Sequence, residues 1–177
     1  MTTATRPAVE AVEGAIAFTD LSGFTEFTAL RGDEAALALL EAQEETLAET
    51  MGSRGRIVKN LGDGFLLWFR DPCDAIDCAL RVQDIFEEQS ADDDLPLWVR
   101  IGVHYGSPLK RGDDIIGHDV NVAARIVDLA APGEVLVSEA CTGAMQRELP
   151  GVMFEEVGPV VMKGIPDSIT LFQAVRA

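Results

Sequence analysis

Asp20 is the first residue of the chain whose type and position could do chemistry. It follows an apolar segment, residues 15–18, which reads as a buried strand, and Gly23 then allows a turn into a helix. A carboxylate at the end of such a strand suits a metal ion, and the glycine-containing turn suits a phosphate. Asp20 and Ser22 are equally typical of residues that cap a helix, so this motif alone leaves both interpretations open.

Asp63 is the second such residue. It lies in Leu61-Gly62-Asp63-Gly64 between two apolar runs, which is the pattern of a β-hairpin over residues 56–69 with a tight Asp-Gly turn. On its own, Asp63 is an ordinary turn residue. One carboxylate after a strand and another on a hairpin turn, however, suit hard divalent cations, because Mg²⁺ is usually held by one or two carboxylates plus water and substrate phosphates. Two metal ions can share such a pair.

Four motifs follow one another along the chain: FTDLSGFT, VKNLGDG, DDIIGHDVNVAAR and VMKG. In this order and at these separations they closely resemble the catalytic domain of class III nucleotidyl cyclases, from about residue 14 to residue 175. The resemblance implies an α+β fold with a ferredoxin-like core and a central, mostly antiparallel sheet covered by helices. We therefore expect residues 14–177 to form a cyclase catalytic domain and residues 1–13 to be a flexible N-terminal lead-in.

The resemblance also implies an activity, the conversion of ATP to 3′,5′-cyclic AMP and pyrophosphate. Asp20 and Asp63 would hold two Mg²⁺ or Mn²⁺ ions, with the backbone carbonyl of Leu21 completing the second site. Asn121 would orient the ribose, and Arg125, four residues further along the same helix face, would stabilise charge on the α-phosphoryl group.

Lys59 and Asp114 are implied to read the base, and Lys163 of VMKG is implied to contact the β- and γ-phosphates. A lysine can donate to N1 of adenine, and an aspartate can accept from its exocyclic amine, so this pair favours ATP over GTP. Taken without the family, Lys59 is an ordinary edge-strand charge, Arg125 a surface ion-pair residue and Lys163 a strand-end lysine.

In the family, one pocket takes its metal carboxylates from one chain and its other groups from a second chain. This chain carries both sets, so we expect a homodimer with two shared active sites. Two alternatives remain: a guanylate cyclase, and a non-catalytic nucleotide-binding module that signals by dimerising.

Composition limits the partners. With 177 residues and 47% hydrophobic content the chain can bury one sizeable core. A formal net charge of −16 argues against nonspecific nucleic-acid binding and against anionic membranes. The sequence contains no apolar run long enough to span a membrane, so a soluble, cytoplasmic domain is expected. Neither His104 nor His118 has the neighbours expected of a zinc ligand.

Hydrophobic periodicity and turn residues predict the remaining elements. Helices are expected at 33–50, 72–89, 119–131 and 139–147, and strands at 97–106 and 134–138, with closing strands after residue 152 that are broken at 164–167. Residues 108–112 are expected to form a polar turn, and the acidic run 92–94 with Pro96 a surface loop. This order indicates an α+β sheet with helices on one side.

Overall fold

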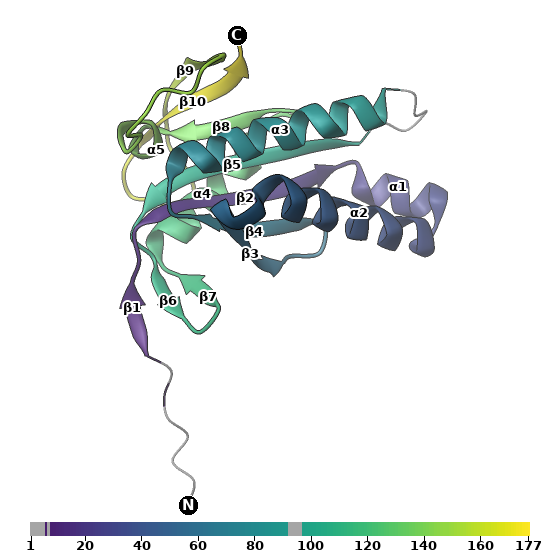
Figure 1. Cartoon of the computed structure of the whole chain (residues 1–177), viewed down its shortest axis with the longest axis horizontal. Coiled ribbons are helices and arrows are strands. Elements are labelled where there is room, and N and C mark those ends of the chain that lie inside the picture. Colours follow the sequence, from purple (N-terminus) through teal and green to yellow (C-terminus); the bar gives the residue numbers. More distant parts are fainter. Residues whose placement is uncertain (1–5, 7, 92–96) are drawn as a thin grey trace, which may run out of the picture.

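A seven-stranded sheet forms the centre of the molecule, and a separate three-stranded sheet lies beside it (Figure 1). The computed structural model describes residue 6, residues 8–91 and residues 97–177. In chain order the elements are β1 (Val9–Ala11), β2 (Gly14–Ser22), α1 (Phe24–Arg31), α2 (Asp33–Met51), the 3₁₀ turn η1 (Gly52–Arg54), β3 (Gly55–Asn60), β4 (Gly64–Phe69), α3 (Pro72–Ser90), β5 (Trp98–Gly106), β6 (Leu109–Arg111), β7 (Asp114–Ile116), α4 (His118–Leu129), β8 (Val135–Ser138), α5 (Glu139–Gly143), β9 (Val152–Val160) and β10 (Ile169–Arg176).

The large sheet has the strand order β3-β4-β2-β5-β8-β10-β9, and every neighbouring pair is antiparallel except β5 with β8. The small sheet has the order β1-β6-β7 and is antiparallel. The expected α+β fold with a mostly antiparallel central sheet is confirmed. Its central strands β2 and β5 carry Asp20 and Arg100, which lie opposite each other in the register.

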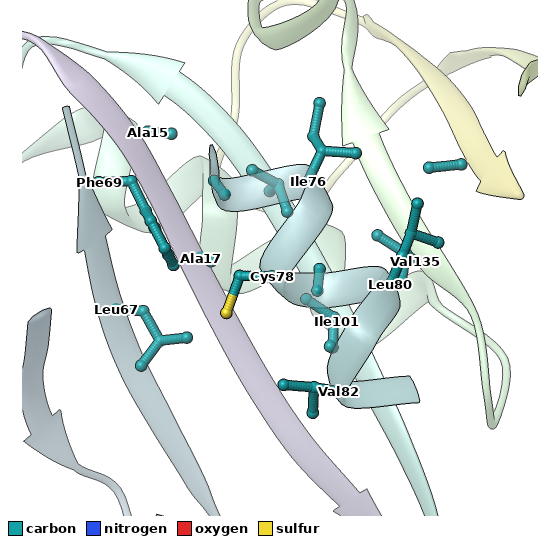
Figure 2. Close-up of a cluster of buried hydrophobic side chains, with 14 of the residues drawn as sticks. Ala15, Ala17, Leu67, Phe69, Ile76, Cys78, Leu80, Val82, Ile101 and Val135 are labelled. Carbon is teal, nitrogen blue, oxygen red and sulfur yellow. The ribbon is translucent and has the colours of Figure 1, made fainter. Parts of the chain in front are cut away.

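Helices cover both faces of the large sheet. On one face, α3 packs against alternate residues of β2, β4 and β5, as Figure 2 shows for Ala15, Ala17, Leu67 and Ile101. On the other face, α4 packs against the residues in between, in two clusters that include Ile16 and Phe18 of β2, Leu136 of β8 and Leu171 of β10. The expectation of helices on one side is wrong, because the central strands are apolar on both faces and both must be buried.

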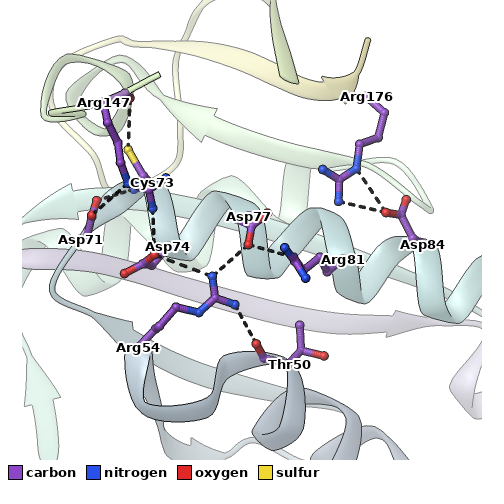
Figure 3. Close-up of polar contacts among 10 residues, drawn as sticks. All are labelled: Thr50, Arg54, Asp71, Cys73, Asp74, Asp77, Arg81, Asp84, Arg147 and Arg176. Atoms are coloured by element: carbon purple, nitrogen blue, oxygen red, sulfur yellow. Dashed lines mark hydrogen bonds and ion pairs between the residues drawn. The ribbon is translucent and has the colours of Figure 1, made fainter. Parts of the chain in front are cut away.

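Helix α3 is fixed at its start by a cap and along one side by ion pairs (Figure 3). The Asp71 carboxylate accepts a hydrogen bond of 2.8 Å from Cys73 N–H, and Pro72 occupies the first turn. Arg54 donates to Asp77 at 2.9 Å and to the Thr50 carbonyl at 2.8 Å, which joins the end of α2 to α3. Burial raises the pKa of Asp77, but the hydrogen bonds from Arg54 and Arg81 outweigh it and leave that pKa below its ordinary value.

Two expectations near the small sheet need correction. Residues 9–11, expected in the flexible lead-in, form β1 and pair with residues 109–111, and the Val12 N–H donates to the Pro108 carbonyl at 3.0 Å. Residues 109–111 are therefore the strand β6, not part of a polar turn; the turn is at Gly112, whose φ is 61°.

Helix α5 also ends earlier than expected, at Gly143. Residues 1–5 and 7 of the lead-in and the acidic loop 92–96 lie outside the described residues.

No helix in the described part of the chain combines the length and the apolar character needed to cross a membrane.

Gln43 is an exception to the apolar packing of α2. Its side chain is 1% exposed, and neither its amide oxygen nor its amide nitrogen has a hydrogen-bond partner among the described residues. A buried polar group without a partner costs about 1–3 kcal/mol. Gln43→Met keeps the length of the side chain and removes both polar atoms, so we expect it to raise the free energy of unfolding by about 1–2 kcal/mol.

Urea denaturation of purified protein measures this change. Gln83→Met is the matched control, because the Gln83 amide donates to the Val99 carbonyl at 2.6 Å and its replacement must lower stability. If Gln43→Met lowered stability as much as Gln83→Met, the Gln43 amide would have to be hydrogen-bonded in solution.

Candidate active site

The hairpin turn between β3 and β4 brings Asp63 to Asp20. Gly62 has a φ of 93°, and its N–H donates to the Asn60 side chain at 2.8 Å, which shapes the turn. The Leu61 N–H donates to the Gly64 carbonyl at 2.8 Å, and the Leu21 N–H donates to the Asp63 carbonyl at 3.1 Å. The second of these bonds ties the turn directly to the residue after Asp20.

Gly64 makes this approach possible. It pairs with Asp20 in the β2–β4 register. A Cβ atom on Gly64 would lie 1.9 Å from the Thr19 carbonyl oxygen, so any other residue would push β4 away from β2. The glycine that follows Asp63 therefore serves close strand packing at the carboxylate pair.

The two carboxylates repel each other. Burial raises the pKa of Asp63, and the negative charge of Asp20 raises it further. Arg100 of β5 lies directly across from Asp20 in the β2–β5 register and forms an ion pair with it. Both side chains keep about a quarter of their surface exposed, 26% for Arg100 and 23% for Asp20. The excess negative charge at Asp63 is what a bound cation would neutralise.

Arg100 was not among the residues singled out from the sequence. Its Nε atom is buried and has no hydrogen-bond partner in the described part of the chain, although the guanidinium faces Asp20. The signal in the sequence is an arginine inside the otherwise apolar strand LWVRIGVHYG. Recognising its role requires the strand register, which local patterns do not provide.

The donor set at Asp20 and Asp63 fits a divalent cation that keeps open coordination positions. The described residues contain no group of three or more His, Cys, Asp or Glu side chains that would enclose an ion. Two carboxylates with mutual repulsion suit Mg²⁺ or Mn²⁺ that also binds water and phosphate oxygens. Leu21 has its side chain buried in the core, and its backbone is fixed beside the pair by the bond to Asp63.

Lys59 and Asp114 are 55 positions apart in sequence and meet in the structure. The Lys59 Nζ lies 3.1 Å from Asp114 Oδ1 and 3.2 Å from Oδ2, with 44% and 41% of the two side chains exposed. The Asp114 carboxylate also accepts from the Ile115 N–H at 2.8 Å. Nearby, Arg56 donates to the Asp113 carbonyl at 2.8 Å, so two contacts hold the β6–β7 hairpin against β3.

Asn121, Arg125 and Lys163 line one open pocket of about 410 Å³, together with Ala124, Gly164 and Ile165. Asn121 and Arg125 come from α4, and Lys163 comes from a turn after β9. That turn is closed by a bond of 3.1 Å from the Ile165 N–H to the Met162 carbonyl, and Gly164 within it has a φ of 80°. Two cations and an amide facing one hollow can bind phosphate and hydroxyl oxygens.

Arg125 is available for such a ligand. Its Nη1 atom lies 3.6 Å from the Asp128 carboxylate of the same helix, and about half of each side chain is exposed, which makes this a weak ion pair.

The sequence-predicted residues thus fall into three groups. The carboxylate pair with Leu21 is one, the Lys59–Asp114 pair is the second, and the α4 pocket is the third. Among the described residues that line the α4 pocket, none belongs to the first two groups.

Residues 8–175 match the family model described as the adenylate and guanylate cyclase catalytic domain. The chain is 30% identical to a pH-sensitive adenylate cyclase of Mycobacterium tuberculosis over 97% of its own length and 43% of that protein. It is 36% identical to an adenylate cyclase of Streptomyces coelicolor over 71% of its own length and 32% of that protein. The chain therefore spans less than half of the length of either relative.

Among solved structures, the adenylyl cyclase CyaB from P. aeruginosa superposes with a TM-score of 0.84 over 96% of this chain and 97% of that chain. Its sequence identity is 21%, so this likeness concerns the fold. The family match extends over nearly the whole chain, from just before β1 to Val175 in β10. The chain belongs to the class III adenylate and guanylate cyclase catalytic domains.

Proposed function

We propose that this chain is an adenylate cyclase domain that converts ATP to 3′,5′-cyclic AMP and pyrophosphate in a homodimer with shared active sites. The observation that carries the choice of ATP is the pair of Lys59 and Asp114, held 3.1 Å apart on two different strands. Such a pair offers a donor for adenine N1 and an acceptor for its exocyclic amine. Guanine reverses this order, with a donor at N1 and an acceptor at O6, so a lysine set against N1 and an aspartate set against the C6 substituent favour adenine.

In the proposed reaction the ribose 3′-hydroxyl gives up its proton to Asp20, water or a substrate phosphate, and its oxygen attacks the α-phosphorus. The bond from the α-phosphorus to the oxygen that bridges to the β-phosphate breaks, and pyrophosphate leaves. Mg²⁺ or Mn²⁺ ions held by Asp20, Asp63 and the Leu21 carbonyl would supply activation of the hydroxyl and charge balance for the leaving group. Arg125 would place its guanidinium against the α-phosphoryl oxygens, where negative charge grows in the transition state.

Asn121 would hold the ribose so that its 3′-oxygen faces phosphorus, and Lys163 would bind the β- and γ-phosphates. Both line the pocket that contains Arg125. Positioning of this kind is a large part of phosphoryl-transfer catalysis, because the reacting atoms must be aligned before the bond forms.

The arrangement also supports a shared site. The α4 pocket and the carboxylate pair have no lining residue in common among the described residues, and each would complete a site with the other from a second copy. Two identical chains related by twofold symmetry would then hold two complete sites.

The test compares cyclic nucleotide formed from ATP and from GTP, each with Mn²⁺ and with Mg²⁺, by chromatography of the products. We expect cyclic AMP from ATP. Cyclic GMP as the main product would make the chain a guanylate cyclase, and no product from either nucleotide would favour a non-catalytic binding module.

The base-reading pair gives a further prediction. Lys59→Glu replaces a donor by an acceptor opposite adenine N1, so kcat/KM for ATP should fall about 10- to 100-fold, since a hydrogen bond to a charged group is worth roughly 1.5–3 kcal/mol. The ratio of GTP to ATP turnover should rise at the same time. Lys110→Glu on β6 makes the same change of charge beside the pair and should leave that ratio unchanged. An equal effect of the two variants would show that charge alone, and not base reading, is responsible.

A further inference from the structure

A chain of polar contacts, buried at His104 and Ser138 and partly exposed at Asp119, joins α4 to the large sheet. His104 of β5 is 6% exposed, and both ring nitrogens have partners. Nε2 lies 3.0 Å from Asp119 Oδ1 in the first turn of α4, and Nδ1 lies 2.7 Å from the Ser138 hydroxyl at the end of β8. The other Asp119 oxygen accepts from the Ser107 N–H at 2.8 Å. Neither the predicted site nor the proposed mechanism uses these residues.

The Asp119 carboxylate fixes the direction of one hydrogen bond of His104, and the charge of the ring fixes the direction of the other. A carboxylate only accepts, so Nε2 of His104 carries the proton and donates to Asp119. In the neutral ring Nδ1 accepts from the Ser138 hydroxyl, whose oxygen accepts in turn from the Cys141 N–H at 3.3 Å. This arrangement contains a neutral imidazole. Burial lowers the pKa of His104 and outweighs the opposing effect of Asp119, which agrees with the neutral form.

Asp119 anchors the start of α4 to the sheet. The residue at the N-cap position is Gly117, which has no side chain to cap the helix, and the Asp119 carboxylate is used for His104 and Ser107 instead. The contact is close: a Cβ atom on Gly106 would lie 2.2 Å from the Asp119 carboxylate. Further along, a Cβ atom on Gly102 would lie 2.5 Å from the Val127 nitrogen. Helix α4 therefore rests directly on β5 at both ends.

We propose that His104 is a positioning residue for the cyclase reaction. Through its hydrogen bond to Asp119 it fixes the position of α4 on the sheet. This inference rests on the proposed function. Asn121 and Arg125 lie two and six residues after Asp119 on the same rigid helix, so a displacement of its first turn moves both. His104 does not line the pocket that they form. A misplacement of about 1 Å at a reacting group can cost 100-fold in rate.

The test uses His104→Leu, which fills the same buried space and breaks both hydrogen bonds. We expect kcat for cyclic AMP formation to fall about 10- to 100-fold, with the KM for ATP changed less than about threefold, because Lys59 and Asp114 lie on other elements. Asp119→Ala should lower kcat similarly. The kcat of the double variant should be no lower than that of the less active single variant, since both changes break the same link between His104 and Asp119. His104→Gln keeps a donor near Asp119 and should retain most of the activity.

Val82→Ala on α3 is the control, because it opens a cavity on the opposite face of the sheet, and activities are compared well below the melting temperature of each variant. The inference is overturned if His104→Leu keeps kcat within twofold of the unmodified chain, or if Val82→Ala of equal melting temperature loses as much. If His104→Leu does not fold, Asp119→Ala and Ser138→Ala answer the same question, and unchanged kcat in both rejects the inference. An unmodified chain that forms no cyclic nucleotide would instead reject the proposed function.

Discussion

Asp20→Asn should reduce the formation of cyclic AMP on the order of 1,000-fold, because metal ions held by carboxylates supply several kcal/mol to such a step and each 1.36 kcal/mol is tenfold in rate. The fold should survive, since the asparagine oxygen can still accept from Arg100 across the strand pair. The measurement is kcat at saturating ATP with Mn²⁺ and with Mg²⁺, together with the melting temperature.

Asp63→Asn should lose activity to a similar extent but should not lose stability. Burial and the charge of Asp20 raise the pKa of Asp63, which means that its charged form is disfavoured in the folded state. Removing that charge therefore leaves stability unchanged or raised at pH 7. Asp113→Asn, in the β6–β7 turn, is the control. It removes a carboxylate but keeps the backbone carbonyl of residue 113, which is the group that Arg56 contacts, so it should keep full activity.

More than a tenth of the activity left in Asp20→Asn would contradict the metal role.

Arg125→Ala should lower kcat about 100- to 1,000-fold, the range found when a group that stabilises transition-state charge is removed. The KM for ATP should change much less, because the guanidinium acts where charge develops. Stability should change by less than about 0.5 kcal/mol, since Arg125 is about half exposed and its ion pair with Asp128 is long. The measurement is steady-state kinetics with ATP.

Two further variants separate catalysis from a surface ion pair. Arg125→Lys keeps the charge but loses the planar fork, and should fall between the unmodified chain and Arg125→Ala. Asp128→Ala removes the ion-pair partner and should leave kcat unchanged. If Asp128→Ala were as slow as Arg125→Ala, the arginine would matter through the helix surface instead.

Local patterns predicted those elements whose signals are local. The helical period placed the start of α3 correctly and its end within one residue. The Asp-Gly turn placed Asp63 at the tip of the hairpin, where the bonds at Gly62 and Gly64 shape the turn. Both depend on neighbours within a few positions, which a sequence pattern records directly.

Contacts between distant segments were beyond such patterns. Strand β1 pairs with β6, about 100 residues away, and each has only three residues, so neither shows periodicity. Arg100 meets Asp20 only because their strands pair in one particular register. The partnership of His104 with Asp119 likewise depends on where α4 rests on β5. Lys59 and Asp114 were paired through the family resemblance, and their spacing of 55 residues gives no such signal.

Helices on both faces of the large sheet could have been predicted from the sequence. Residues 15–18 of β2 are all buried, which requires apolar layers above and below the strand. Cover on one side was expected from the order of strands and helices. In β5, the residues facing α4 include Gly102 and His104, which are small or polar for reasons of close packing and hydrogen bonding. Polar character in a strand therefore did not mean exposure.

The most direct test of the shared site mixes two inactive variants, Asp20→Ala and Arg125→Ala, under conditions that allow subunits to exchange. In a heterodimer, one site carries both substitutions and the other carries neither. Random pairing gives half heterodimers with one working site each, so a 1:1 mixture should recover about a quarter of the specific activity of the unmodified chain. No recovery, with heterodimers detected by native mass spectrometry, would contradict a site built from the carboxylates of one chain and helix α4 of the other.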